Sequence, residues 1–167
     1  MNYTVLIILL PLLGAVISGL CIIGKRNILA EVISTLLVCL SALMSIHVYF
    51  SLEKFIKNIT IYEWIKFSDL SLNFSIYLDP LTSIMFCVVT IVSAVVHIFS
   101  IGYMHSDKFR ARFFCYLSLF TFAMLILVCS DNFIQLFLGW EGVGLCSYLL
   151  VGFYFHKPSA NNAAIKA

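Results

Sequence analysis

Charged residues are scarce in this chain. Of its 167 residues only 11% are Asp, Glu, Lys or Arg, whereas 62% are hydrophobic. Soluble domains contain about 25% charged residues, so this composition excludes a water-soluble globule and indicates a protein surrounded by lipid. The net charge is only +2, and the sequence has no basic cluster with interleaved aromatic residues. We therefore expect the lipid bilayer, and no nucleic acid, as a partner.

Clustered cysteines and nucleotide-binding glycine patterns are also missing. The six cysteines stand singly in apolar runs without a C-x-x-C spacing: Cys21, Cys39, Cys87, Cys115, Cys129 and Cys146. This arrangement favours small buried hydrophobes over metal ligands or disulfides, so we expect no metal and no cofactor in this chain. No basic region precedes the first apolar run and no small-residue cleavage site follows it. That run is therefore expected to be a retained span rather than a signal peptide.

Long apolar runs dominate what is present. A helix needs about 20 apolar residues to cross a bilayer, and five segments reach that length, at about 3–23, 29–50, 80–104, 113–130 and 133–155. They predict an all-α integral membrane protein, with residues 1–167 forming a single membrane domain. Only Asp131 and Asn132 separate the last two runs. We expect a tight turn there, with Asp131 capping the fifth helix.

The basic residues predict the orientation of the spans. Three lysines, Lys54, Lys57 and Lys66, lie on one side. The other side carries seven Lys and Arg residues: Lys25, Arg26, Lys108, Arg110, Arg112, Lys157 and Lys166. By the positive-inside rule, the N-terminus lies outside, in the periplasm or intermembrane space, and the C-terminus lies inside, in the cytoplasm or matrix.

The long external loop between the second and third spans has a strand pattern. From Leu70 to Leu78 apolar and polar residues alternate strictly, and a weaker alternation runs from Ile59 to Phe67. Period-two alternation is typical of half-buried strands. With Ser68-Asp69 as the turn, the pattern predicts a small external β-hairpin at about 59–78. Two strands alone are marginally stable, so we expect the apolar face of the hairpin to pack on helix ends.

The third span carries a polar stripe. Thr90, Ser93, His97 and Ser100 follow one another at offsets of three and four residues, which places them on one helix face. Such residues commonly form hydrogen bonds between membrane helices. Because imidazole titrates near physiological pH, His97 is also a candidate for a proton-relay or hydration site. The stripe alone leaves both interpretations open.

Glu141 is the most informative residue, because it stands within an apolar span. Such an acid costs roughly 2.5–3.5 kcal/mol near the middle of a membrane helix, and Glu141 lies about 12 Å from the start of its span at 1.5 Å per residue. Gly142 and Gly144 are expected to let a backbone or water approach the carboxylate. Two interpretations of Glu141 are open. It is either a structural glutamate, paired with a hydrogen-bond donor or a lysine on another helix, or a group that relays protons. No Lys or Arg lies at membrane depth in the five spans, so Glu141 is either protonated or has a partner elsewhere.

The residues around Glu141 resemble a known family. The run from Asp131 to Leu150, with Gly139-Trp140-Glu141-Gly142-Val143-Gly144 at its centre, is similar to the fifth-helix signature of the antiporter-like subunit 5 (subunit L) family of NADH–quinone oxidoreductase, respiratory complex I. The resemblance extends over essentially the whole chain and is strongest from Asp79 onward. Further matches are Asp79-x-Leu81-Thr82, Val95 to Met104, Arg112-Phe113 and Ala163 to Ala167.

The resemblance implies a role as the N-terminal part of a proton-translocating membrane-arm subunit. Electron transfer from NADH to quinone (ubiquinone in some members) would occur elsewhere in the complex, with NAD, FMN, iron–sulfur clusters and quinone bound by other subunits. Glu141 matches the family's essential proton-relay glutamate, and His97 lies where a polar path is expected. The implied location is a bacterial inner membrane or the mitochondrial inner membrane, with other membrane-arm subunits as partners.

One departure from the family pattern keeps alternatives open. Family members continue well beyond the position of Ala167 and carry there a lysine that pairs with the glutamate. We therefore expect a C-terminal remainder with that lysine as a partner and, because it has no redox centre, expect the chain alone to be inactive. The alternatives are a subunit of a multisubunit Na⁺/H⁺ antiporter or membrane-bound hydrogenase, and a truncated fragment that does not pump.

Overall fold

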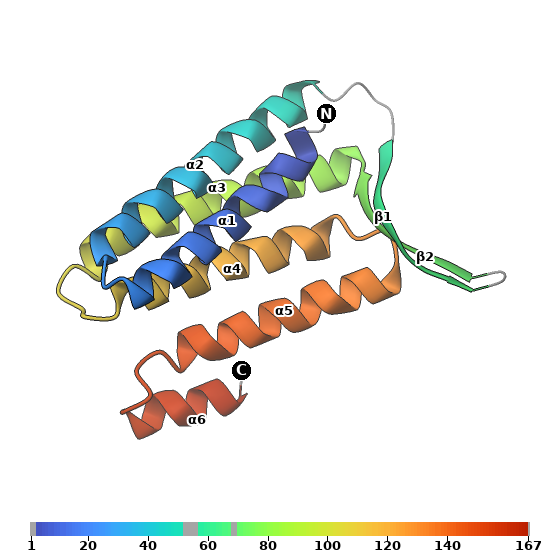
Figure 1. Ribbon diagram of the computed structural model, residues 1–167. Coiled ribbons are helices and arrows are strands. Elements are labelled where there is room, and N and C mark those ends of the chain that lie inside the picture. Colours follow the sequence, from blue (N-terminus) through green and yellow to red (C-terminus); the bar gives the residue numbers. More distant parts are fainter. Residues whose placement is uncertain (1–2, 52–56, 68–69, 167) are drawn as a thin grey trace.

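The computed structural model describes residues 3–51, 57–67 and 70–166. The elements follow the order α1 (Tyr3–Ile23), α2 (Asn27–Ser51), β1 (Lys57–Phe67), β2 (Leu70–Leu78), α3 (Pro80–Tyr103), α4 (Arg110–Val128), α5 (Phe133–Val151) and α6 (Pro158–Lys166) (Figure 1). Helices α1 to α5 are long and apolar enough to cross a membrane. The predicted fold class, five membrane helices with a small hairpin between the second and third, is confirmed.

The helix ends differ from the apolar runs in three places. Helix α2 begins at Asn27 and α4 at Arg110, earlier than predicted, whereas α5 ends at Val151. The apolar residues Phe153 to Phe155 belong to the turn after α5 rather than to the helix, and Phe153 is buried there. The short helix α6 was not predicted. It is too polar for a hydropathy search, and Pro158 at its first position suits a helix start.

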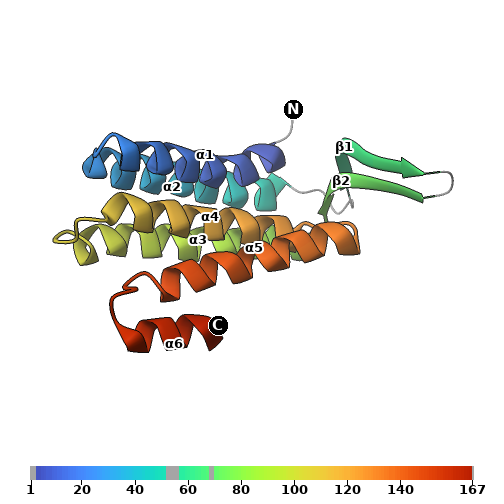
Figure 2. The ribbon, with the colours of Figure 1, turned by 60° about the horizontal axis from the view of Figure 1, so that its bottom comes forward.

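Helices α1 to α4 form a closely packed bundle, and α5 lies against α4 on its outside (Figures 1 and 2). Gly14 on α1 marks a close approach of α1 to α2 and α4, because a Cβ there would stand 3.4 Å from the Cα of Ser34 and 3.5 Å from Oγ of Ser118. Hydroxyl groups join the helices as well: Ser41 Oγ donates to the carbonyl of Ile7 at 2.7 Å. Small residues and hydroxyls are typical of helix packing in lipid.

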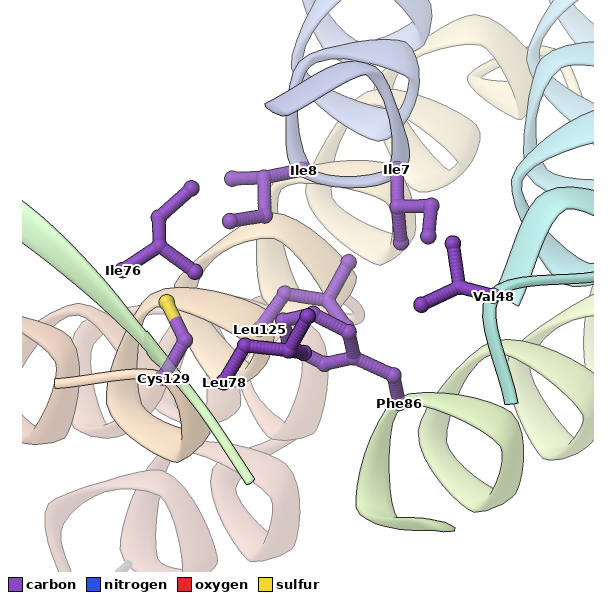
Figure 3. Close-up of a cluster of buried hydrophobic side chains, with 8 residues drawn as sticks. All are labelled: Ile7, Ile8, Val48, Ile76, Leu78, Phe86, Leu125 and Cys129. Atoms are coloured by element: carbon purple, nitrogen blue, oxygen red, sulfur yellow. The ribbon is translucent and has the colours of Figure 1, made fainter. Parts of the chain in front are cut away.

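A hydrophobic cluster lies at the end of the bundle next to the hairpin. Figure 3 shows side chains from both strand β2 and the helices pointing into it: Ile7, Ile8, Val48, Ile76, Leu78, Phe86, Leu125 and Cys129. Ile76 and Leu78 are almost completely buried, and Ile59 on β1 is partly buried against the cluster. The apolar face of the hairpin therefore packs on helix ends, as predicted.

The two strands pair antiparallel, from Lys57 opposite Leu78 to Phe67 opposite Leu70, with two register shifts in β1. The predicted Ser68-Asp69 turn lies outside the described residues. Strand β2 departs from simple alternation because Ser75 is also buried. The main-chain N–H and carbonyl of Ser75 are both hydrogen-bonded to the side chain of Gln135 on α5.

The capping prediction for α5 was wrong by one residue. Asn132, not Asp131, is the N-cap, and its side-chain oxygen accepts from the N–H of Gln135 at 2.9 Å. The extended backbone of Asn132 turns its side chain over the first turn of the helix. Asp131 instead accepts hydrogen bonds from Asn58 Nδ2 at 2.7 Å and Ser75 Oγ at 2.9 Å. It holds both strands of the hairpin to the α4–α5 turn.

Candidate functional site

Helix α5 has one packed face, and small residues form most of it. Gln135, Gly139 and Cys146 are buried, and Gly142 approaches Ala123 of α4 so closely that a Cβ would stand 3.0 Å away. Positions 135, 139, 142 and 146 recur at helical spacing, so they share one face. This stripe holds α5 against α4.

Glu141 lies on the other side of α5. It is two residues from Gly139, or about 200° around a helix of 3.6 residues per turn, and it is exposed. Its neighbours on this side are exposed apolar or aromatic residues, with Phe137 at 59%, Leu138 at 44% and Tyr148 at 48%. Within the described residues the Glu141 carboxylate has no hydrogen bond or ion pair. The carboxylate is therefore available to a group from another segment or subunit.

The two glycines expected to open a path to Glu141 differ in what surrounds them. Gly142 faces α4 and contacts Ala123, so the prediction for this residue was wrong. A Cβ at Gly144 would meet nothing within 4 Å. Gly144 is exposed, as is Glu141 one helical turn earlier, so both lie on the side of the helix that α4 leaves uncovered.

His97 is the centre of a second polar site, inside the bundle. Its side chain is fully buried between α3 and α4. Nδ1 lies 2.8 Å from the carbonyl oxygen of Ser93, and Nε2 lies 3.1 Å from Oγ of Ser118. A carbonyl can only accept, so Nδ1 carries a proton. Nε2 can accept from the Ser118 hydroxyl in the neutral ring or donate to it in the charged ring, so the hydrogen-bond partners suit both states.

Hydroxyl groups extend this site on both sides. Thr121 Oγ1 on α4 donates to the carbonyl of Leu117 at 3.0 Å, which leaves Ser93 as the donor in the 2.5 Å contact between the Ser93 and Thr121 hydroxyls. One helical turn from Ser93, Thr90 shares a 2.7 Å hydrogen bond with Ser45 of α2. The polar stripe of α3 thus makes the interhelical hydrogen bonds that the sequence suggested.

The two candidate residues belong to separate sites. His97 faces α4 from within the four-helix bundle, whereas Glu141 lies on the side of α5 that turns away from α4. Helix α4 packs against both α3 and α5, so it stands between the two groups. The structure does not bring them together.

A buried ion pair escaped the sequence analysis. Arg110 at the start of α4 donates from Nη1 to Oε2 of Glu31 on α2 at 3.2 Å, with the Glu31 side chain only 7% exposed. Glu31 falls inside the second predicted span, and a carboxylate in an apolar span indicates a buried partner. Its partner, 79 residues away, could not be identified from the sequence.

Side chains that could bind a metal do not cluster in the part of the chain that the structure describes. It holds no cluster of three or more His, Cys, Asp or Glu side chains with a geometry for metal binding. All six cysteines are free thiols.

Family models match two parts of the chain. The model described as "NADH-Ubiquinone oxidoreductase (complex I), chain 5 N-terminus" matches residues 64–114. The model described as "NADH:quinone oxidoreductase/Mrp antiporter, TM" matches residues 130–167. The second match contains Glu141, and the first contains His97.

Solved structures share the fold. One is the Mrp complex from Dietzia sp., with a TM-score of 0.76 at 22% identity over 98% of this chain and 17% of that one. Another is the membrane-bound sulfane sulfur reductase, an archaeal respiratory membrane complex, with a TM-score of 0.77 at 17% identity over 99% of this chain and 24% of that one. At these identities the likeness concerns the fold alone.

Similar sequences extend over nearly all of the chain. NADH-quinone oxidoreductase subunit L of Rickettsia typhi is 53% identical over 99% of this chain and 26% of the relative. NADH-ubiquinone oxidoreductase chain 5 of Marchantia polymorpha is 49% identical over 97% of this chain and 24% of the relative. This chain thus spans about a quarter of the length of these relatives. The matches to both parts and the similarity over the whole length show that the chain belongs to the family of NADH–quinone oxidoreductase subunit L and chain 5.

Proposed function

We propose that this chain forms the N-terminal part of a proton-translocating membrane-arm subunit of NADH:quinone oxidoreductase. In this proposal Glu141 takes up and releases a proton as neighbouring charges change, while electron transfer from NADH to quinone takes place in other subunits. Those subunits would bind NAD, FMN, the iron–sulfur clusters and quinone.

The position of Glu141 carries this proposal. Its carboxylate lies in an apolar helix, on the side that α4 leaves uncovered, as does Gly144. A carboxylate held at membrane depth is costly unless a partner or a proton neutralises it. A charge supplied by another helix would stabilise the ionised form, and withdrawal of that charge would favour uptake of a proton. These two states are what a proton relay needs.

The partner in this proposal is a lysine on a segment of the subunit beyond the described residues. The exposed side of α5, which includes Phe137, Leu138 and Tyr148, supplies an apolar surface for that segment to cover. Other membrane-arm subunits would surround the completed subunit. The names of the relatives, which are subunits of an oxidoreductase, support this assembly.

His97 would contribute a second polar site in the same proposal. The Ser118 hydroxyl can accept from or donate to Nε2, so the ring can gain or lose a proton without losing its hydrogen-bond partners. Thr121 and Ser93 continue the polar contacts within the bundle. We infer that this network forms part of a polar path, which reaches Glu141 only through groups that are not in the described residues.

The proposed orientation places the hairpin outside the membrane and the opposite end of the bundle inside. The turns between α1 and α2, between α3 and α4 and between α5 and α6 lie at the end of the molecule opposite the hairpin (Figure 1). Lys25, Arg26, Lys108 and Lys157 fall in these turns. Basic residues are enriched in cytoplasmic loops, which supports an inside location for this end and for the C-terminus.

Two other functions remain in competition. The fold shared with the Mrp complex favours a subunit of a multisubunit Na⁺/H⁺ antiporter, or of a membrane-bound hydrogenase, as the second candidate. Sodium-dependent proton exchange in membranes that contain this chain would favour the antiporter. The third candidate is a fragment that does not pump, and it predicts a chain that migrates apart from any respiratory complex.

The experiment that tests the proposal is mass spectrometry of a native gel of solubilised membranes. We expect peptides of this chain in the band that oxidises NADH, together with peptides that carry the partner lysine. Recovery of the chain only outside that band would contradict the proposal. Recovery of the chain in a band that does not oxidise NADH and that contains antiporter subunits would favour the second candidate over the proposal.

A further inference from the structure

Arg112, in the first turn of α4, is a cation with few partners. Its only hydrogen bond within the described residues runs from Nη2 to the carbonyl of Phe153 at 3.3 Å, and its buried Nε has none. No described carboxylate lies within ion-pair distance of its guanidinium. An arginine side chain has five N–H donors. Most of the donor capacity of Arg112 is therefore unused.

Aromatic rings hold this guanidinium in place. Its central carbon lies 4.9 Å from the ring centre of Phe109, 4.8 Å from that of Phe153 and 5.7 Å from that of Phe155. Such contacts attract the cation but satisfy none of its N–H groups. Arg110, in the same turn of the helix, contrasts with it by forming the ion pair with Glu31. Of the two arginines in this turn, Arg112 is the one without a carboxylate partner among the described residues.

A cavity of about 460 Å³ adjoins Arg112 between α4, α5 and α6. Its wall is polar at Arg112, Tyr116 and Asn161, and apolar at Leu149 and Ile165. No side chain caps the first turn of α4, and the N-terminal end of a helix carries partial positive charge. The nearby Asp107 carboxylate binds the N–H of Phe109, just before this turn, and not the arginine. An occupant with an anionic head and an apolar body suits this cavity.

We propose that Arg112 binds the phosphate group of an anionic phospholipid from the surrounding bilayer, with part of an acyl chain lying along Leu149 and Ile165. Guanidinium and phosphate pair through two parallel N–H···O bonds. The site lies at the end of the bundle that carries most of the basic residues, where anionic headgroups are attracted. An inorganic phosphate ion would use the arginine but not the apolar wall.

The test measures lipid retention by the purified 167-residue chain. The chain in mild detergent is mixed with phosphatidylglycerol or phosphatidylcholine, and bound lipid is counted by native mass spectrometry. We expect Arg112→Gln to retain at least fivefold less phosphatidylglycerol than the parent chain. Arg26→Gln is the matched control, because it removes an exposed arginine at the same end of the bundle, and it should bind like the parent.

A second variant keeps the test decisive if Arg112→Gln fails to fold. Ile165 lines the cavity but is 77% exposed, so Ile165→Asp leaves the core intact and repels phosphate. We expect it to lower phosphatidylglycerol retention as well. Unchanged retention in both variants, equal binding of phosphatidylcholine, or displacement of the lipid by millimolar inorganic phosphate would overturn the proposal. The last result would identify a simple anion site.

Discussion

Gly139 on α5 lies directly against the main chain of Leu127 on α4. A Cβ at Gly139 would stand 2.7 Å from both the Cα and the N atom of Leu127, a distance at which backbone would have to move. This contact fixes how α5 rotates on the bundle. It turns Gly139 inward and leaves Glu141, about 200° farther around the helix, on the uncovered side.

Gly139→Ala is therefore expected to loosen α5. The added methyl group meets backbone rather than a flexible side chain, and overpacking of this kind costs about 1–3 kcal/mol. Gly144→Ala is the matched control, since a Cβ there meets nothing within 4 Å. The thermal unfolding midpoint of the purified chain in detergent should fall for the first variant and not for the second. Equal midpoints would contradict the close contact.

Gln135 is expected to hold α5 to the hairpin. Its amide donates from Nε2 to the carbonyl of Ser75 at 2.9 Å, and its Oε1 accepts from the Ser75 N–H at 3.1 Å. Gln135→Leu leaves both buried main-chain groups unsatisfied, at a cost of about 1–3 kcal/mol each. Hydrogen exchange at the Ser75 amide should become faster. Asn132, which caps α5 but bonds the hairpin only once, supplies the comparison: Asn132→Ser keeps a cap and should leave that amide protected.

The ion pair between Glu31 and Arg110 is expected to stabilise the end of the bundle opposite the hairpin. Removing either partner leaves the other largely buried, and a hydrogen bond to a charged group contributes about 1.5–3 kcal/mol. Glu31→Gln and Arg110→Gln should each lower the unfolding midpoint. In the double variant the losses should be less than additive, because the two residues act as a pair. Additive losses would show that they act independently.

Asp79 is expected to make stability depend on pH. The hydrogen bond from the Thr82 N–H, at 2.6 Å, holds the pKa of the Asp79 carboxyl below its ordinary value of 3.8. A lowered folded-state pKa means that the stabilisation is present above about pH 4 and is lost as pH falls through the folded-state value. Asp79→Asn keeps a cap without the charge, so its unfolding midpoint should vary less with pH in that acidic range. A parallel acid response of variant and parent would contradict this assignment.

Hydropathy and alternation predicted most of the fold, because length and period decide whether a segment spans lipid or pairs as a strand. The start of α5 at Phe133 and the pairing of residues 57–67 with 70–78 follow from those patterns. The choice between Asp131 and Asn132 as the N-cap of α5 does not follow from these patterns. Both side chains can accept a hydrogen bond from the N–H groups at a helix N-terminus. They differ because Asp131 instead accepts hydrogen bonds from the two strands of the hairpin.

The surroundings of the candidate site were harder to predict than its residues. Sequence alone singled out Glu141 and His97 but could not show that α4 packs against both of their helices. One available signal was missed: Gly139, Gly142 and Cys146 recur at the spacing of a helix-packing stripe, which would have turned Gly142 away from Glu141. The pairing of Glu31 with Arg110 depends on how α2 and α4 meet, and no local pattern encodes it.

The most direct test of the account replaces Glu141 with Gln in membranes where this chain is assembled, and measures protons pumped per NADH oxidised. Glu141→Gln keeps the shape of the side chain but cannot carry a proton, so we expect the ratio to fall while the amount of assembled complex stays unchanged. Glu31→Gln is the matched control, because it changes a structural carboxylate and should leave the ratio intact. A Glu141→Gln complex that assembles and pumps with the parental ratio would contradict the proposed relay.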